Sequence, residues 1–83
     1  MEKDEIVAVV NDFLVNEFEV DRDDIVNDAN FKTTLGLDSL DYIDMVVVIE
    51  SNFGVKLGEA DFKKIVVFDD FYNAIQNKIS EKI

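Results

Sequence analysis

The apolar residues of this 83-residue chain recur at intervals of three and four, and this spacing most constrains what the chain can fold into. Side chains three and four residues apart lie on one face of an α-helix, whereas a strand places alternate residues on one face. Three long segments have this spacing, and a shorter one lies between the second and the third. The spacing therefore predicts an all-α fold: a small four-helix bundle of three longer helices and one short helix.

The first predicted helix begins at Asp4, a residue type that favours the N-cap position, and its apolar stripe fades near Phe18. The last predicted helix runs from about Asp69 to the C-terminus, and a short helix is expected over residues 61–65. The two apolar stripes are Ile6, Val9, Val10, Phe13 and Leu14, and Phe68, Phe71, Tyr72, Ile75 and Ile79. We expect a single domain over residues 1–83 and a monomer.

Residues 19–38 have no sustained period and are rich in Asp and Asn. This pattern predicts a long loop between the first and second helices. Four apolar residues would hold the loop against the core: Ile25, Phe31, Leu35 and Leu37. Long loops in compact domains are more often functional than idle.

The second long helix is expected to start at Asp38–Ser39 and to end near Asn52, before a C-cap glycine at Gly54. Asp38 can cap it, with Asp41 three residues later in the capping-box position. The β-branched run at 46–49 would also suit a strand. However, the larger apolar residues around it keep a helical spacing: Tyr42, Met45, Val46, Ile49 and Phe53. The helix is therefore the preferred interpretation.

The chain is strongly acidic, with 19 acidic and 8 basic residues and a net charge of −11. Nucleic acids and anionic lipid surfaces repel such a protein, so we expect neither nucleic-acid binding nor membrane insertion. A basic protein surface is the complementary partner. The sequence also lacks cysteine and an apolar targeting segment, which favours a cytoplasmic location.

Ser39 would be the first residue of the second helix, because Asp38 takes the cap. Free backbone N–H groups and a partial positive charge make a helix start suitable for a phosphate. The local pattern alone is more often that of an ordinary serine at a helix start.

A projection of this helix at 100° per residue places Leu40 and Val47 opposite the core face, with Ile43 at the border. Three acidic residues lie among them: Asp41, Asp44 and Glu50. Exposed apolar residues interleaved with acids favour a docking surface, although scattered apolar residues are also normal on protein surfaces.

Two other kinds of chemistry find little support. A calcium loop starting at Asp21 would need Gly at its sixth position and Glu at its twelfth, where Val26 and Lys32 stand. No metal site is therefore expected. No catalytic constellation is visible either, so we expect a protein that is not an enzyme.

The segment Leu35–Gly36–Leu37–Asp38–Ser39–Leu40–Asp41 resembles the phosphopantetheine attachment site of the acyl carrier protein family, and the similarity extends over nearly the whole chain. The resemblance implies that Ser39 carries a 4′-phosphopantetheine arm, derived from coenzyme A, and that Asp38 belongs to the attachment motif. The family fold is a four-helix bundle. Tyr42 is larger than the residue often found at its position, which bears on the size of any acyl cavity.

The resemblance further implies a carrier of growing acyl chains, held as thioesters on the arm, with fatty-acid biosynthesis as the expected pathway. Its partners would be a phosphopantetheinyl transferase and acyl-transfer and chain-elongation enzymes with basic docking patches. The docking residues would be Leu40, Asp41, Ile43, Asp44, Val47 and Glu50. Alternatives are a carrier for polyketide, aryl polyene or lipid-modification pathways. From another class, an acidic helical binding module or ion sensor remains open.

Overall fold

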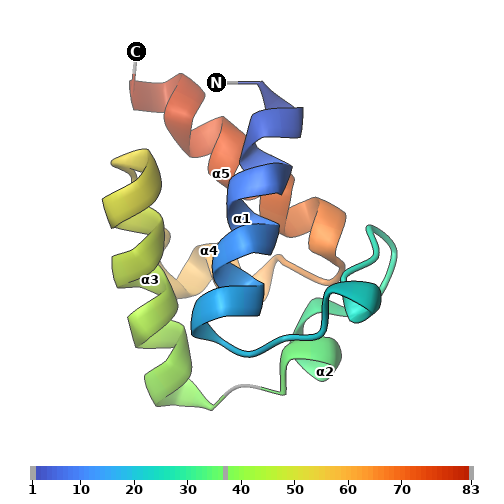
Figure 1. Cartoon of the computed structure of the whole chain (residues 1–83). Helices are drawn as coiled ribbons and strands as arrows, with labels where there is room; N and C mark the ends of the chain where they lie inside the picture. The colour runs from blue at the N-terminus through green and yellow to red at the C-terminus, as the bar shows by residue number, and fades with distance from the viewer. Residues whose placement is uncertain (1, 37, 83) are drawn as a thin grey trace.

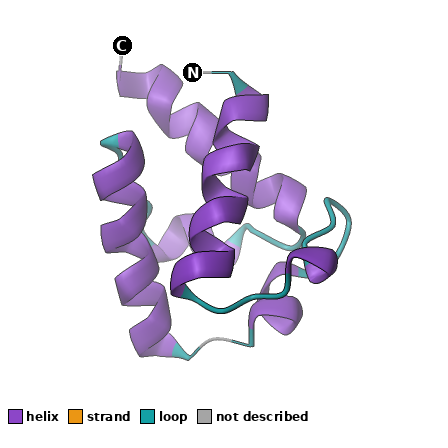
Figure 2. Ribbon diagram, viewed as in Figure 1, coloured by secondary structure: helices purple, strands orange, loops and turns teal. Residues whose placement is uncertain are grey.

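The computed structural model describes residues 2–36 and 38–82, with the side chains of all of these except Ser39 and Lys82. The described residues form helices and loops, and no strand is present among them (Figure 2). The helices are α1 (Lys3–Glu17), α2 (Phe31–Leu35), α3 (Ser39–Phe53), α4 (Glu59–Lys63) and α5 (Phe68–Lys82) (Figure 1). The three long helices each have 15 residues, which confirms the predicted all-α fold.

Helix α2 corrects the prediction of a continuous loop over residues 19–38. The Asn30 side chain caps α2 by accepting a hydrogen bond from the Thr33 N–H at 2.8 Å, and Gly36 ends it in the left-handed conformation with φ 58°. Phe31 and Leu35 lie one turn apart and are both buried. The helix escaped prediction because five residues hold only one repeat of the helical spacing. The same loop also contains a 3₁₀ turn, Arg22–Asp24.

Several helix boundaries also differ from the predicted ones. The prediction that Asp4 caps α1 was wrong: Glu2 takes the N-cap position and makes no side-chain cap bond. Asp4 lies in the first turn, where its charge still suits the positive end of the helix dipole. Helix α4 begins two residues earlier than expected, and α5 begins one residue earlier, at Phe68.

The start of α5 is capped from within the helix. The Asp70 carboxylate accepts hydrogen bonds from the N–H groups of Val66 at 3.0 Å and Val67 at 3.2 Å. The residues before α5 therefore need no serine or threonine to satisfy these backbone donors.

The core is one cluster formed by the apolar stripes of the helices. Phe31 is fully buried, with its ring centroid 5.4 Å from that of Phe68 and 4.6 Å from that of Phe71. The predicted stripe residues Ile6, Val10, Phe13, Leu14, Phe68, Phe71, Tyr72 and Ile75 are buried, and Val9 and Ile79 are partly buried.

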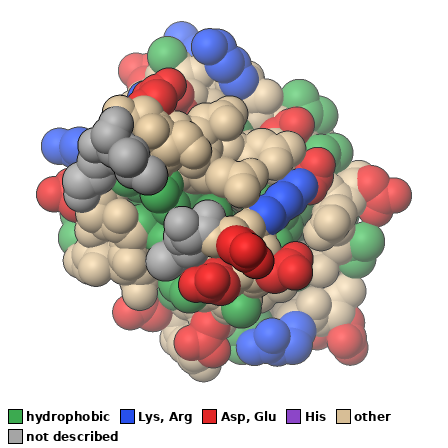
Figure 3. Space-filling view, turned by 90° about the horizontal axis from the view of Figure 1, so that it is seen from above, with side chains coloured by type: hydrophobic (Ala, Val, Ile, Leu, Met, Phe, Trp, Pro, Cys, Tyr) green, Lys and Arg blue, Asp and Glu red, His purple; other side chains and the backbone are tan. Residues whose placement is uncertain are grey.

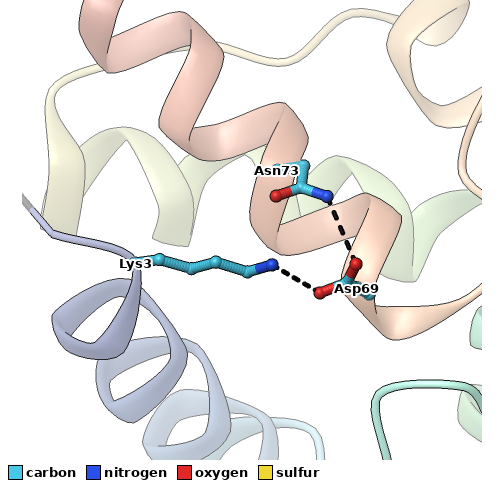
Figure 4. Close-up of polar contacts among 3 residues, drawn as sticks. All are labelled: Lys3, Asp69 and Asn73. Atoms are coloured by element: carbon cyan, nitrogen blue, oxygen red, sulfur yellow. Dashed lines mark hydrogen bonds and ion pairs between the residues drawn. The ribbon is translucent and has the colours of Figure 1, made fainter.

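Two polar contacts join α1 to α5, which lie side by side (Figure 1). The Tyr72 hydroxyl donates to Asn11 Oδ1 at 2.6 Å, and burial raises the pKa of Tyr72 to about 12. Lys3 Nζ donates to Asp69 Oδ1 at 2.6 Å, while Asn73 Nδ2 donates to Asp69 Oδ2 (Figure 4). These contacts hold the two terminal helices together: Lys3 and Asp69 lie in the first turns of α1 and α5, and Asn11 and Tyr72 lie further along each helix.

The loop before α2 is attached to the start of α5 by backbone hydrogen bonds. The Phe31 N–H donates to the Val66 carbonyl at 2.9 Å, and the Phe68 N–H donates to the Ala29 carbonyl at 3.2 Å. An isolated antiparallel bridge pairs Asn30 with Val67. The segment leading to α3 is therefore ordered by contacts with residues far away in the sequence. None of the helices in the described part of the chain has both the length and the apolar character needed to cross a bilayer.

Replacing Glu19 with glycine is expected to stabilise the protein. Glu19 follows the C-cap of α1 and has φ 56°, a left-handed conformation that is costly for a residue with a Cβ atom. Glycine removes this cost but adds entropy to the unfolded chain, so we expect a net gain of about 0.5–1 kcal/mol in the free energy of unfolding. Urea denaturation measures this gain. Glu19→Gln is the control, because it removes the charge and keeps the Cβ; an equal gain there would contradict the backbone explanation.

Candidate functional site

The start of α3 is closed by a capping box between two aspartates. The Asp41 N–H donates to Asp38 Oδ1 at 3.0 Å, and the Asp38 N–H donates to Asp41 Oδ2 at 3.4 Å. This confirms the expected cap and makes Ser39 the first residue of the helix. The cap is thus complete without the Ser39 side chain. That side chain lies outside the described residues, as does Leu37.

The next turns of α3 separate a buried face from an exposed one. Met45 and Ile49 are fully buried, whereas Leu40, Ile43 and Val47 are 71%, 60% and 59% exposed. The burial pattern agrees with the projection made from the sequence. Among the acidic residues of this face, Asp44 and Glu50 are exposed and Asp41 is partly buried. We call Leu40, Asp41, Ile43, Asp44, Val47 and Glu50 the α3 face.

A groove of about 560 Å³ lies beside the α3 face. It is lined by Lys32, Tyr42, Ile43, Val46, Leu57, Glu59, Phe62 and Lys63. Only Ile43 belongs both to this groove and to the α3 face, so the two surfaces are continuous. Most of the lining residues escaped sequence reasoning, because they come from α2, α3, α4 and the loop between α3 and α4, and only the tertiary fold brings them together.

Tyr42 forms part of the groove wall rather than packing wholly into the core. Its ring stands edge-on to Phe62, with the centroids 5.5 Å apart. Burial raises the pKa of Tyr42, so the phenol keeps its proton at neutral pH. Residues three and four positions apart on a helix are neighbours, so Tyr42 and Ile43 place the groove one turn from Ser39.

On the face that carries the termini, acidic side chains are spread among fewer basic ones (Figure 3). Asp21 accepts a hydrogen bond from the Asp23 N–H at 3.0 Å, which makes it the cap of the 3₁₀ turn. In the part of the chain that the structure describes, no group of three or more acidic residues could hold a metal ion.

Comparisons with known proteins agree with this geometry. Residues 8–75 match the family described as "Phosphopantetheine attachment site". The chain is 32% identical over 80 residues to a protein of Petrotoga mobilis named "Acyl carrier protein", covering 96% of this chain and 94% of the relative. It is 35% identical over 77 residues to a protein of the same name from Thermotoga maritima, covering 93% and 95%. A third relative of that name, from Lactobacillus acidophilus, is 30% identical over 77 residues.

Proposed function

This chain belongs to the acyl carrier protein family, a family of non-catalytic carriers with a phosphopantetheine attachment site, and on that premise we propose that Ser39 bears the arm. The observation that carries the proposal is the capping box of Asp38 and Asp41. Because these two side chains satisfy the cap, the cap does not require the hydroxyl of the first helical residue, and a phosphodiester bond at that oxygen would leave the cap intact. Ser39 also lies within the matched residues 8–75.

The start of α3 suits the charge of such an arm. The first N–H groups of a helix carry a partial positive charge, which stabilises an adjacent phosphate by about 0.3–1 kcal/mol at an exposed site. When bound, the arm supplies a terminal thiol that holds an acyl group as a thioester. The protein provides attachment, positioning and docking, and the reactions belong to its partner enzymes.

Attachment can be tested directly on the purified chain. Incubation with coenzyme A and a broad-specificity phosphopantetheinyl transferase should add the mass of one arm. Fragmentation of the loaded protein should locate that mass on Ser39. Samples without coenzyme A are the control, and failure to load with several transferases would contradict the proposal.

Fatty-acid biosynthesis is the pathway that we propose, on the strength of the resemblance at residues 35–41. Intact mass of the protein purified from its own host tests this, because arm and cargo are read together. A ladder of saturated chains is expected. Polyketide, aryl polyene or other specialised cargo would overturn the assignment of the pathway without affecting that of Ser39.

We further propose that basic surfaces of partner enzymes dock on the α3 face. Val47→Asn and Asp44→Lys should both weaken binding to such an enzyme while leaving the helical circular dichroism spectrum intact, since both side chains are exposed. The charge change should act mainly on the association rate and its salt dependence, and the loss of apolar contact mainly on dissociation.

Surface plasmon resonance at two salt concentrations measures these rates. Val26→Asn and Asp28→Lys are matched controls, because they make the same changes at exposed positions away from α3. Equal losses in the controls would contradict the assignment of the face. Unfolding of Val47→Asn would place Val47 in the core instead.

A further inference from the structure

The groove beside α3 has the composition of a small-molecule site. Its volume of about 560 Å³ falls within the range of roughly 300–1,000 Å³ typical of ligand pockets. Two of its apolar residues are well buried, Leu57 at 1% exposed and Phe62 at 9%, whereas Lys32, Glu59 and Lys63 are exposed at its edge. A ligand with an apolar body and a polar group would match this arrangement.

Two polar groups of the groove are hydrogen-bond donors that have no partner among the described residues. The Glu59 carboxylate lies 3.8 Å from Lys63 Nζ, and both side chains are largely exposed to solvent. Lys32 makes no ion pair with any other described residue, and the Tyr42 hydroxyl makes no hydrogen bond with one. No side-chain polar atom in the described part of the chain is both buried and unpaired, so the Tyr42 hydroxyl reaches solvent. The groove thus offers an O–H and an ammonium group, while its one carboxylate lies at the exposed edge beside Lys63.

We propose that Tyr42 and Lys32 make this groove bind an acyl chain with a keto oxygen, such as a β-ketoacyl intermediate of chain elongation, more tightly than an alkyl chain of the same length. The inference rests on the proposed function, because the cargo must be tethered at Ser39, one turn from the groove. Both chains can cover the apolar wall formed by Val46, Leu57 and Phe62. Only the keto chain provides a hydrogen-bond acceptor for the Tyr42 hydroxyl and the Lys32 ammonium group. Beside an alkyl chain, these two donors can hydrogen-bond only to water.

The test compares two cargoes of equal length on the full chain. β-Ketooctanoyl and octanoyl groups, each joined to the arm by a stable amide, are loaded by a transferase, and intact mass confirms the loading. Thermal unfolding then measures how much each cargo raises the midpoint above that of the unloaded protein. The variants are Tyr42→Phe, which removes only the hydroxyl, and Lys32→Met, which keeps most of the aliphatic stem. Lys64→Met is the matched control, because Lys64 is exposed and does not line the groove.

In the parent and in Lys64→Met, the keto cargo should raise the midpoint by roughly 2–8 °C more than octanoyl, as a net hydrogen bond does in a domain of this size. Tyr42→Phe and Lys32→Met should each reduce that difference by at least half. Equal shifts for the two cargoes in the parent, or a difference that survives in full in either variant, would overturn the proposal. Failure of the chain to load would instead overturn the proposed attachment at Ser39, and intact mass separates the two outcomes.

Discussion

Ser39→Ala is expected to abolish attachment of the arm completely while the protein folds like its parent. The cap of α3 consists of the side chains of Asp38 and Asp41, so removal of the serine hydroxyl breaks neither hydrogen bond of the cap. We therefore expect the free energy of unfolding to change by no more than about 0.5 kcal/mol, as for ordinary surface substitutions. The loss of loading should be total, because the attachment oxygen itself is removed.

Intact mass after incubation with coenzyme A and transferase measures the loading, and urea denaturation measures the free energy of unfolding. Ser51→Ala and Ser80→Ala are matched controls, since both serines are exposed on helices and neither stands at a helix start. Both controls should load like the parent. An arm on the Ser39→Ala protein would refute the assignment.

Phe31→Ala should cause a large loss of stability. Phe31 is fully buried and touches both Phe68 and Phe71. Truncation of a buried phenylalanine costs about 3–5 kcal/mol, through lost transfer free energy and the cavity left behind. A domain of this size has roughly 5–15 kcal/mol in total, so the variant should be close to unfolding at room temperature.

The midpoint of urea denaturation at low temperature measures this loss of stability. Leu40→Ala is the control, because Leu40 is 71% exposed and its truncation should stay within about 0.5 kcal/mol. A loss below about 1 kcal/mol for Phe31→Ala would show that α2 does not anchor the segment before α3 to α5.

The sequence alone predicted the three long helices and the start of α3, because these depend on local signals. Asp38, Asp41 and Gly54 each act within a few residues of the helix end that they form. The exposed position of Leu40 and Val47 also followed from helical geometry, since the core-facing residues of α3 determine which side remains outside. Local signals were less reliable where they were short or ambiguous. Helix α2 contains only one repeat of the helical spacing, and Glu2 rather than Asp4 takes the N-cap position of α1.

The groove could be identified only from the tertiary structure. Lys32, Tyr42 and Phe62 lie in three different helices, and no periodicity relates their positions in the sequence. They meet because Phe31 packs into the aromatic core and its N–H bonds to Val66, which brings α2 against the segment between α4 and α5. Periodicity reports which face of a helix is buried, whereas the partner of that face depends on long-range packing. The sequence therefore determined the three long helices and the attachment motif, and the packing of the helices determined the surface beside that motif.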